Sequence, residues 1–382
     1  MKTIKVMSVF GTRPEAIKMC PLVLELQRRS AIESLVCVTA QHREMLDSVL
    51  DCFHVTPDYD LNIMAKGQTL ADITTRALNG LCRIFTEAKP DLVLVHGDTT
   101  TAFAGALAAF YSKIPVGHVE AGLRTHDKWS PYPEEMNRCL IGRIADYHFS
   151  PTIQNAENLK AENIHDGIFI TGNTVIDAMQ YTVQSGNGFS TKALQDLDFT
   201  HRRVITMTCH RRENYGAPME QIFSAVRQIA TQFSDVDIVY PVHLSPVVRE
   251  AAQRNLGNIA NIHLIEPLDA LEMHRLMNRS YLVMTDSGGI QEEAPSLGKP
   301  VLVLRRETER PEAVAAGTVV LAGVETDDIV RLATALLTDR TSYDKMAKAV
   351  NPYGDGTACA RIVDAILYSF GITDVKPQHF AP

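Results

Sequence analysis

The sequence predicts an α/β protein made of two doubly wound halves, each a parallel sheet covered by helices. Short apolar runs alternate with longer amphipathic stretches in the first half, and the same alternation restarts at Val204. This pattern is typical of βαβ units, in which helices cover both faces of a parallel sheet. The segment Gln180–Arg203, which joins the halves, is polar and has no strong strand pattern. We therefore expect the domain boundary between residues 170 and 200.

The predicted strands are short apolar runs, and the predicted helices lie between them. In the first half the strands are Ile4–Phe10, Leu35–Thr39, Leu92–His96, Val116–Val119 and Tyr147–Phe149, with helices such as Pro14–Arg29, Leu70–Glu87 and Thr99–Tyr111 between them. In the second half the strands are Val204–Thr208, Ile238–Tyr240, Ile262–Leu264, Leu282–Thr285 and Val301–Leu304. Two such sheets predict one deep cleft, with ligands beyond the carboxyl ends of the strands.

Composition excludes several classes of protein. The net charge of -8 disfavours non-specific binding to nucleic acid. The seven cysteines are odd in number and widely spaced, so neither a disulfide framework nor a thiolate zinc site is expected. No apolar run approaches the roughly 20 residues of a membrane helix, and the N-terminus is typical of a strand rather than a signal peptide. We expect a cytoplasmic protein that does not bind membranes.

Motifs that the sequence lacks exclude further classes of function. The chain has no GxxxxGK[ST] loop, no GxGxxG after the first strand and no HExxH or other clear metal cluster. A nucleotide triphosphatase, a bound NAD and a bound metal are therefore not expected. The expected cofactor is none.

Residues that follow the first predicted strand form a candidate anion site. Gly11 permits a tight turn, and Pro14 suits the first turn of a helix. The helix N-terminus together with Arg13 and Lys18 would attract an anion. An ordinary βα turn with a surface arginine explains the same residues equally well.

Three carboxylates follow strands of the first half or begin a helix there. Asp98 could act on a ligand or simply cap the next helix. Glu120 has no obvious folding role, although an ion pair with Arg124 is a structural alternative. Glu134 and its neighbour Glu135 occupy a first helical turn, where the helix dipole alone would favour them. Their convergence at one sheet edge favours acid–base chemistry, because crowded carboxylates separate one another's pKa values.

The second half supplies cations and a glycine-rich turn. His210 and Arg211 follow a strand and are typical of phosphate contacts, whereas Cys209 is better explained by packing than as a nucleophile. His243 follows the next strand, where contact with a ligand and simple exposure are equally compatible. The strongest signal is DSGGIQEE, in which Ser287, Gly288 and Gly289 would let backbone N–H groups approach a diphosphate. In the same region, Glu293 could hold ribose hydroxyls and Arg310 adds a cation.

The motifs GTRPEAIKM, TAQHREML, LVHGDTTT, VGHVEAGLRT, SPYPEEMNR, HRREN, YPVHL, TDSGGIQEEAPSLGKPVLVLR, TERPEA and NPYGDG occur in this order. Together they closely resemble the bacterial non-hydrolysing UDP-N-acetylglucosamine 2-epimerases, from about Ile4 to about Ile372. The resemblance implies a GT-B-type fold of two Rossmann-like domains with the active site in the cleft between them. It also implies domains at 1–172 and 173–354, with a C-terminal helix at about 355–371 that packs back on the first domain.

The resemblance further implies a homodimer that converts UDP-GlcNAc to UDP-ManNAc for surface polysaccharides or wall polymers. By the same resemblance, the catalytic residues are Asp98, Glu120, Glu134 and His210. Contacts with substrate or UDP would come from Arg13, Lys18, Met273, Ser287, Gly288, Gly289, Glu293 and Arg310. A second UDP-GlcNAc would bind as an allosteric activator near Gln41, Glu44, Arg211 and His243.

The chain departs from the family pattern at three positions in or near these sites. Met273 replaces the usual Phe that packs on the uracil, and weaker stacking is expected there. Gly67 replaces an Arg found in several relatives at the activator site, and Glu44 is Gln in some relatives. These changes put uracil affinity and allosteric activation in question while leaving the catalytic carboxylates intact.

The expected chemistry begins with loss of UDP, because the proton on carbon 2 of the sugar is otherwise a poor acid. Departure of UDP gives carbon 1 oxocarbenium character and acidifies that proton, so a 2-acetamidoglucal forms. Return of a proton on the other face and of UDP completes the inversion. The alternatives are a GT-B glycosyltransferase, a hydrolysing epimerase that releases ManNAc, and a UDP-sugar sensor without turnover.

Overall fold

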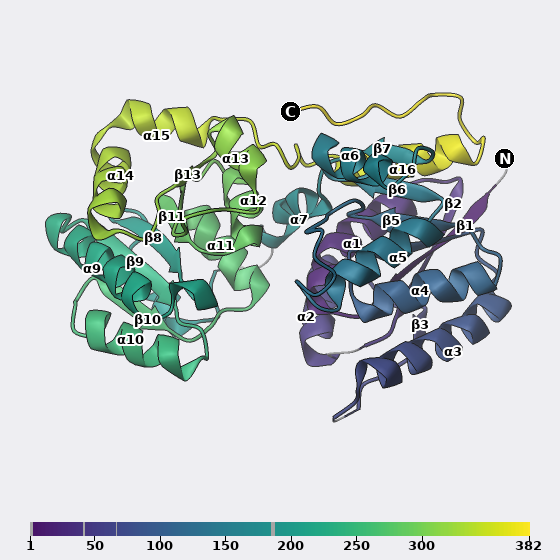
Figure 1. Ribbon diagram of the computed structural model, residues 1–382, viewed down its shortest axis with the longest axis horizontal. Helices are drawn as coiled ribbons and strands as arrows, with labels where there is room; N and C mark the ends of the chain where they lie inside the picture. Colours follow the sequence, from purple (N-terminus) through teal and green to yellow (C-terminus); the bar gives the residue numbers. More distant parts are fainter. Residues whose placement is uncertain (1–2, 41–42, 66, 185–187) are drawn as a thin grey trace. The chain divides into compact units, whose positions relative to one another are not determined.

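The structure is a computed structural model that describes residues 3–40, 43–65, 67–184 and 188–382. The chain divides into two compact units (Figure 1). Unit 1 comprises Met1–Tyr181 and Tyr353–Ala381, and unit 2 comprises Thr182–Pro352. The domain limits expected from the sequence stay a prediction, because compactness alone does not define a domain that folds by itself.

Unit 1 contains a seven-stranded sheet in which every neighbouring pair is parallel. The strand order is β3-β2-β1-β4-β5-β6-β7. The strands are β1 (Ile4–Phe10), β2 (Ile32–Val38), β3 (Tyr59–Asp60), β4 (Leu92–His96), β5 (Val116–Val119), β6 (Tyr147–Ser150) and β7 (Ile168–Ile170). The helices are α1 (Arg13–Gln27), α2 (Arg43–Phe53), α3 (Leu70–Ala88), α4 (Thr100–Tyr111), α5 (Glu134–Ile144), α6 (Ile153–Ala161), α7 (Thr174–Thr182) and α16 (Ala358–Ser369).

Unit 2 repeats the same winding with six parallel strands, in the order β10-β9-β8-β11-β12-β13. These are β8 (Arg203–Thr208), β9 (Val236–Pro241), β10 (Ile262–Ile265), β11 (Leu282–Thr285), β12 (Val301–Val303) and β13 (Val319–Leu321). The helices are α8 (Lys192–Gln195), the 3-10 helix η1 (Arg212–Asn214), α9 (Ala217–Gln232), α10 (Pro246–Leu256), α11 (Ala270–Arg279), α12 (Gly288–Ser296), α13 (Pro311–Ala316), α14 (Thr326–Thr338) and α15 (Arg340–Ala347).

Two parallel, doubly wound sheets confirm the predicted α/β fold class. The central strands are apolar and buried, as β4 shows with the fully buried run LVLV, because helices cover both faces of a parallel sheet. Three strands were not expected from the sequence: β3, β7 and β13. Each has only two or three residues and lies at a sheet edge, so its apolar run is too short to stand out.

In each unit the strand order reverses between two central strands, which are β1 and β4 in unit 1 and β8 and β11 in unit 2. Loops at such a reversal lead away from each other and leave room for a ligand at the carboxyl ends of the strands. The loops after β1 and β4 in unit 1, and after β8 and β11 in unit 2, are therefore where a ligand is expected.

The last helix completes unit 1. α16 packs on α1, and Asp177 of α7 accepts the backbone N–H groups of Ala358 at 3.1 Å and Cys359 at 2.8 Å. Burial raises the pKa of Asp177, and these hydrogen bonds partly oppose that rise. The two N–H groups belong to the first turn of α16, where a helix cannot satisfy its own donors. Asp177 is therefore a cap supplied by a different helix.

The C-terminal tail covers an edge of the same sheet. The backbone N–H of Phe380 donates to the carbonyl of Ile170 in β7 at 2.7 Å. The Phe380 ring is buried and carries the guanidinium of Arg361 at 5.3 Å from its centroid. Covering an edge strand in this way removes a template for unwanted strand pairing.

Among the helices of the described residues, none is long and apolar enough to cross a membrane.

Replacing Asp177 with Ala should lower the free energy of unfolding by about 1–3 kcal/mol, because two buried N–H groups lose their acceptor. The control is Asp374→Ala, which removes an exposed carboxylate and should change stability by less than about 0.5 kcal/mol. Urea unfolding followed by circular dichroism measures both. Equal effects of the two substitutions would show that α16 docks without this cap.

Candidate functional site

The expected site residues of unit 1 lie at the carboxyl edge of its sheet. Strands β1, β4 and β5 are neighbours, and Gly11, Asp98 and Glu120 follow them soon after their last residues. Parallel pairing brings these three loops to one edge, including the point where the strand order reverses.

A buried carboxylate holds the turn after β1. Thr12 caps α1, and Glu15 Oε2 accepts the backbone N–H groups of Gly11 at 3.0 Å and Thr12 at 2.8 Å. Glu15 Oε1 accepts the hydroxyl of Thr99 at 2.7 Å, which ties this turn to the one after β4. Burial raises the pKa of Glu15, and its hydrogen bonds partly oppose that rise. Only glycine fits at position 11, because a Cβ there would lie 1.9 Å from Thr39 Oγ1.

Glu120 is held by two donors on one oxygen. Lys18 Nζ lies 2.5 Å from Glu120 Oε1, and Asn173 Nδ2 donates to the same oxygen at 3.0 Å. The backbone of Glu120 has a φ of +63°, which is rare for a side chain of this size. Burial by itself would raise the pKa of Glu120, but Lys18, His96 and the hydrogen bonds bring it to about 2. The side chain is therefore ionised at neutral pH.

His96 faces the second oxygen of this carboxylate. Its Nε2 lies 3.4 Å from Glu120 Oε2 and is buried without a hydrogen bond among the described residues. Burial lowers the pKa of His96 to about 4, so the ring is neutral near pH 7. Lys18 is therefore the cation that balances Glu120. The alternative partner, Arg124, pairs instead with Glu162 at 2.6 Å, so that structural explanation of Glu120 is wrong.

Asp98 is not a helix cap. Thr99 caps α4 by accepting the N–H of Ala102 at 3.0 Å. Asp98 Oδ2 instead accepts two hydrogen bonds from Arg138, from Nε at 2.9 Å and from Nη2 at 2.6 Å. Asp98 is partly exposed at the sheet edge and paired with a cation, which leaves its other oxygen for a ligand.

Glu134 and Glu135 have different surroundings in the structure, although the sequence did not distinguish them. Glu135 is buried, accepts the N–H groups of Thr125 and His126 at 3.0 Å each, and pairs with Arg138 at 3.0 Å. Burial raises the pKa of Glu135, but these contacts outweigh it and lower the pKa. Glu134 is half-buried and has no hydrogen-bond or ion-pair partner among the described residues of unit 1. Glu135 therefore shapes the loop, whereas Glu134 takes no part in holding it.

We call Asp98, Glu120, Glu134 and Lys18 the acidic edge. Arg138 and Asn173 belong to it as partners, and the sequence did not single them out. Arg138 lies four residues after Glu134, a helical spacing that could have indicated it, whereas nothing in the sequence pointed to Asn173. Arg13 is the first residue of α1 and is half-buried. Its guanidinium has no hydrogen-bond or ion-pair partner among the described residues of its unit.

In unit 2 the loops after β8 and β11 meet at the reversal of strand order. Asp286 directly follows β11 and is fully buried. Its Oδ2 accepts the backbone N–H groups of His210 at 2.7 Å and Arg211 at 2.8 Å, and the Asn214 side chain at 3.1 Å. Asp286 therefore fixes the loop after β8 against the loop after β11.

The start of α12 is the centre of a positive cluster. Ser287 is its N-cap and makes no capping hydrogen bond with its side chain. A Cβ on Gly288 would lie 3.7 Å from Glu309 Oε2 and 3.8 Å from an Nη2 atom of both Arg211 and Arg310, and Arg211 Nη2 pairs with that Glu309 oxygen at 3.8 Å. Helix N–H groups and two guanidinium groups thus converge where Gly288 leaves space, which suits a phosphate. We call His210, Arg211, Ser287, Gly288, Gly289 and Arg310 the anion cradle.

Buried partners orient the rest of the cradle. Arg310 forms an ion pair with Glu292 of α12. Gln291 accepts the Thr308 hydroxyl at 2.6 Å, and Thr308 in turn accepts the N–H of Arg310 at 3.1 Å. Glu293 lies one turn into α12, with its Oε2 atom 3.6 Å from His274 Nε2. These contacts fix the Arg310 loop against α12.

Aromatic and sulfur-containing side chains lie on the neighbouring loops and on α11. The rings of His210 and His243 stack with centroids 5.3 Å apart and planes inclined by 10°. Burial raises the pKa of Cys209 well above its ordinary value, so its thiol is protonated and unsuited to nucleophilic attack. Met273 is half-buried on α11, the helix that also carries His274.

The expected activator positions are only partly described. Gln41 lies outside the described residues, and Glu44 lies in α2 with its side chain outside them. Gly67 has a φ of +72°, and no described atom lies within 4 Å of the place that a Cβ would take there. A larger residue would therefore fit at position 67 but would be strained. Arg211 and His243 lie in the loops after β8 and β9.

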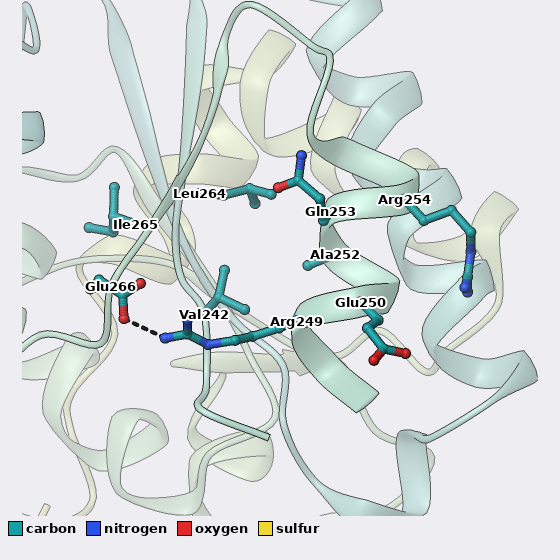
Figure 2. A pocket seen from close by; sticks show the side chains of 9 residues that line it. All are labelled: Val242, Arg249, Glu250, Ala252, Gln253, Arg254, Leu264, Ile265 and Glu266. Carbon is teal, nitrogen blue, oxygen red and sulfur yellow. Dashed lines mark hydrogen bonds and ion pairs between the residues drawn. The ribbon is translucent and has the colours of Figure 1, made fainter. Parts of the chain in front are cut away.

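A separate pocket of about 730 Å³ lies between α10 and the end of β10, and Val242, just after β9, also lines it (Figure 2). Figure 2 shows the guanidinium of Arg249 reaching Glu266 across its mouth. None of the expected site residues lines this pocket. Within the described part of the chain, no group of three or more His, Cys, Asp or Glu residues could hold a metal ion.

Known proteins resemble this chain over nearly its whole length. The family described as UDP-N-acetylglucosamine 2-epimerase matches residues 24–367. The UDP-N-acetylglucosamine 2-epimerase of Bacillus subtilis strain 168 is 58% identical over 381 residues, covering 100% of this chain and 99% of that protein. A crystal structure of UDP-N-acetylglucosamine 2-epimerase matches with a TM-score of 0.93 and 56% identity, covering 100% of both chains.

The crystal structure of UDP-GlcNAc 2-epimerase from Neisseria meningitidis, bound to UDP-GlcNAc, matches with a TM-score of 0.82 and 49% identity. It covers 95% of this chain and 100% of that one. The resemblance predicted from the sequence motifs is confirmed by these matches. The chain belongs to the UDP-N-acetylglucosamine 2-epimerase family.

Proposed function

We propose that this protein is an isomerase that interconverts UDP-GlcNAc and UDP-ManNAc by eliminating and re-adding UDP. The observation that carries the proposal is the acidic edge, where three carboxylates of one sheet edge have three different surroundings. Glu120 is paired with Lys18, Asp98 with Arg138, and Glu134 has no partner among the described residues of its unit. The related Neisseria enzyme, crystallised with UDP-GlcNAc, supports the same substrate here.

The different surroundings suit the two proton transfers of the reaction. Inversion at carbon 2 needs a base on one face of the sugar and an acid on the other. Glu120 is ionised at neutral pH because its pKa is about 2, so we assign it to accept the proton from carbon 2. Asp98 and Glu134 are then the candidates to deliver a proton on the other face. Re-addition of UDP to carbon 1 completes the cycle.

The anion cradle would stabilise the departing diphosphate. When the bond between carbon 1 and oxygen breaks, its electron pair stays on the diphosphate oxygen, and negative charge grows there. N–H groups at the start of α12 and the guanidinium groups near Gly288 are already fixed in place, so they need little reorganisation. The family resemblance also assigns Arg13 of unit 1 to contact with the substrate. Glu293 and Met273 would contact the ribose and the uracil.

We further propose a cytoplasmic homodimer that supplies UDP-ManNAc for surface polysaccharide or wall polymer synthesis. Exposed apolar side chains on the paired helices α4 and α5 support self-association: Phe110, Tyr111, Met136 and Leu140. A second UDP-GlcNAc would act as an activator near Gln41, Glu44, Arg211 and His243. The left-handed Gly67 at the expected activator site predicts weaker activation than in relatives that carry Arg there.

The activity is tested by incubating the purified protein with UDP-GlcNAc in deuterated water and following proton NMR. We expect UDP-ManNAc with deuterium at carbon 2, because the removed proton exchanges with solvent before re-addition. Free ManNAc with UDP would indicate a hydrolysing enzyme. Unchanged substrate, even at high UDP-GlcNAc, would favour a glycosyltransferase or a sensor.

The same assay tests the acidic edge. Asp98→Asn, Glu120→Gln and Glu134→Gln should each lower kcat by roughly 10²–10⁴-fold, the usual contribution of a positioned acid or base. Glu157→Gln, on the exposed surface of α6, is the matched control and should retain full activity. Wild-type turnover by any of the three site variants would remove that residue from the mechanism.

Replacing Lys18 with Met should raise the pKa of Glu120, because burial then acts without the neighbouring cation. Glu120 is a base only above its pKa, so the acid limb of kcat/KM against pH should move to higher pH. Lys18→Arg keeps the positive charge and should keep a profile close to the wild type. A Lys18→Met enzyme that is slower at every pH with an unmoved limb would contradict the pairing of Lys18 with Glu120.

Substituting Glu for Leu140 should shift the protein from dimer to monomer, because a charge would be buried in the proposed interface. Sedimentation velocity across a concentration series measures the change. Ile153→Glu, at another exposed apolar position on α6, is the control and should leave the dimer intact. A wild-type monomer, or a dimer unaffected by Leu140→Glu, would place the interface elsewhere or remove it.

A further inference from the structure

The loop between β8 and α9 contains a pair of side chains that the proposed mechanism uses only in part. Asp286 is fully buried, and its two oxygens have different surroundings. Oδ2 accepts three hydrogen bonds, from two backbone N–H groups and from Asn214. Oδ1 is buried and accepts no hydrogen bond from a nitrogen or oxygen donor among the described residues, although the Cys209 thiol is hydrogen-bonded to this carboxylate. A thiol is a weak donor, and a buried carboxylate oxygen without a strong donor is costly, so its surroundings require an explanation.

The group that faces this oxygen is the imidazole of His210. Its Nδ1 lies 3.4 Å from Asp286 Oδ1. A proton on Nδ1 would satisfy the oxygen after a small shift, whereas a bare Nδ1 would place two acceptors against each other. The other ring nitrogen, Nε2, is not among the buried unpaired atoms of the described residues, and the side chain is about one-third exposed. The ring therefore has an inner nitrogen beside Asp286 and an accessible outer nitrogen.

We propose that Asp286 is a positioning residue that fixes His210 with a proton on Nδ1 and so presents Nε2 to the diphosphate of the nucleotide sugar. This inference rests on the proposed function, in which the anion cradle holds that diphosphate. A histidine whose inner nitrogen is held by a carboxylate has one tautomer and one orientation. It can take a second proton on Nε2 when an anion binds, because Asp286 balances the added charge.

During elimination the bond between carbon 1 and the diphosphate oxygen breaks, and its electron pair stays on that oxygen. Nε2–H of the His210 imidazolium donates a hydrogen bond to the oxygen as its charge grows. Re-addition reverses the step, and no proton or electron is left over. Asp286 does not touch the substrate in this scheme. Its Oδ1 atom acts through His210, and its Oδ2 atom holds the loop.

The other charged groups around His210 set the sign of its pH dependence. Burial lowers the pKa of His210, Asp286 raises it, His243 and Arg211 lower it, and Glu213 raises it. Next to Asp286 itself lie the Cys209 thiol and the Tyr240 hydroxyl, and the pKa of each is raised, so both are neutral. Of the two carboxylates that favour the imidazolium, Asp286 therefore has the larger effect on the pKa of His210. Its removal should lower the pKa of His210 further.

The chain offers a matched control in the same unit. Asp237, the second residue of β9, is also buried, and its Oδ1 lies 3.0 Å from His263 Nε2. It also pairs with Arg202. This second aspartate–histidine pair lies at the amino ends of its strands, away from the loops of the anion cradle. Asp237→Asn should reduce stability to a similar extent without affecting the cradle.

The first measurement uses the wild-type protein and does not depend on epimerase activity. Nitrogen-15 NMR of labelled histidines, with the His210 signal assigned by its loss in His210→Gln, reports which ring nitrogen carries the proton. We expect Nδ1 to stay protonated through the titration and Nε2 to be the site that titrates. A neutral ring with its proton on Nε2 would overturn the inference, whether or not the protein is an epimerase.

The second measurement compares Asp286→Asn with Asp237→Asn. Asp286→Asn should lower the pKa of His210, and the decline of UDP affinity with rising pH should begin at a lower pH. It should also lower kcat/KM for UDP-GlcNAc by roughly 10²–10⁴-fold, as removal of a histidine-orienting carboxylate does elsewhere. Asp237→Asn should change none of these. Folded Asp286→Asn protein with an unmoved His210 pKa would show that Asp286 merely holds the loop.

A double-mutant cycle separates positioning from direct contact. If Asp286 acts through His210, adding Asp286→Asn to His210→Gln should cost at least about tenfold less in kcat/KM than Asp286→Asn costs in the wild type, because only the loop contacts of Oδ2 are then left to lose. Equal losses in both backgrounds would assign Asp286 a purely structural role. Failure of the wild type to produce UDP-ManNAc would instead refute the proposed function, while the tautomer and UDP-binding results would still decide the role of Asp286.

Discussion

Parallel pairing of the strands is the constraint on which the rest of this structure depends. It forces every loop that follows a strand to one edge of its sheet, and reversal of the strand order spreads two of those loops apart. Asp98 and the turn at Gly11 lie on either side of such a reversal in unit 1, as His210 and Asp286 do in unit 2. Residues far apart in sequence thus become neighbours, and hydrogen bonds such as those of Glu15 to Thr99 and of Asp286 to His210 then hold the loops together.

At the carboxyl edge of each sheet, buried and exposed carboxylates have different roles. Glu15, Glu135 and Asp286 are buried and accept backbone N–H groups, so each fixes a loop. Asp98 and Glu134 are partly exposed at the edge that those loops create. Glu120 lies between the two groups, since it is nearly buried but is neutralised by a lysine rather than by backbone donors. Inner carboxylates hold the geometry, and outer ones remain available to a ligand.

The sequence was sufficient for the elements with strong patterns and for the residues directly after them. The apolar run at Leu92–His96 and the glycine turn after Thr285 are examples, because buried strands and tight turns permit few residue types. The two-residue strand β3 was missed, since its pairing depends on the neighbouring strand rather than on its own composition.

Partnerships between distant side chains were harder to predict. The sequence did not distinguish the roles of Glu134 and Glu135. Only the structure shows that Glu135 accepts the backbone N–H of Thr125. It offered Arg124 as a partner for Glu120, whereas Arg124 reaches Glu162 and Lys18 reaches Glu120. Such choices depend on the relative heights of loops above a sheet, which no local pattern encodes. The roles of the site residues in catalysis and activation stay predictions.

The division of unit 1 into two separated stretches of chain has a consequence for synthesis on the ribosome. The segment Tyr353–Ala381, which brings α16 to α1 and the tail to β7, emerges only after all of unit 2. At about 5–20 residues per second, that delay is on the order of ten to thirty seconds. During this time the surface of α1 that α16 later covers is exposed to solvent. The carboxylate of Asp177 also lacks the helix N-terminus that it caps. Unit 1 therefore cannot complete its packing until translation is nearly finished.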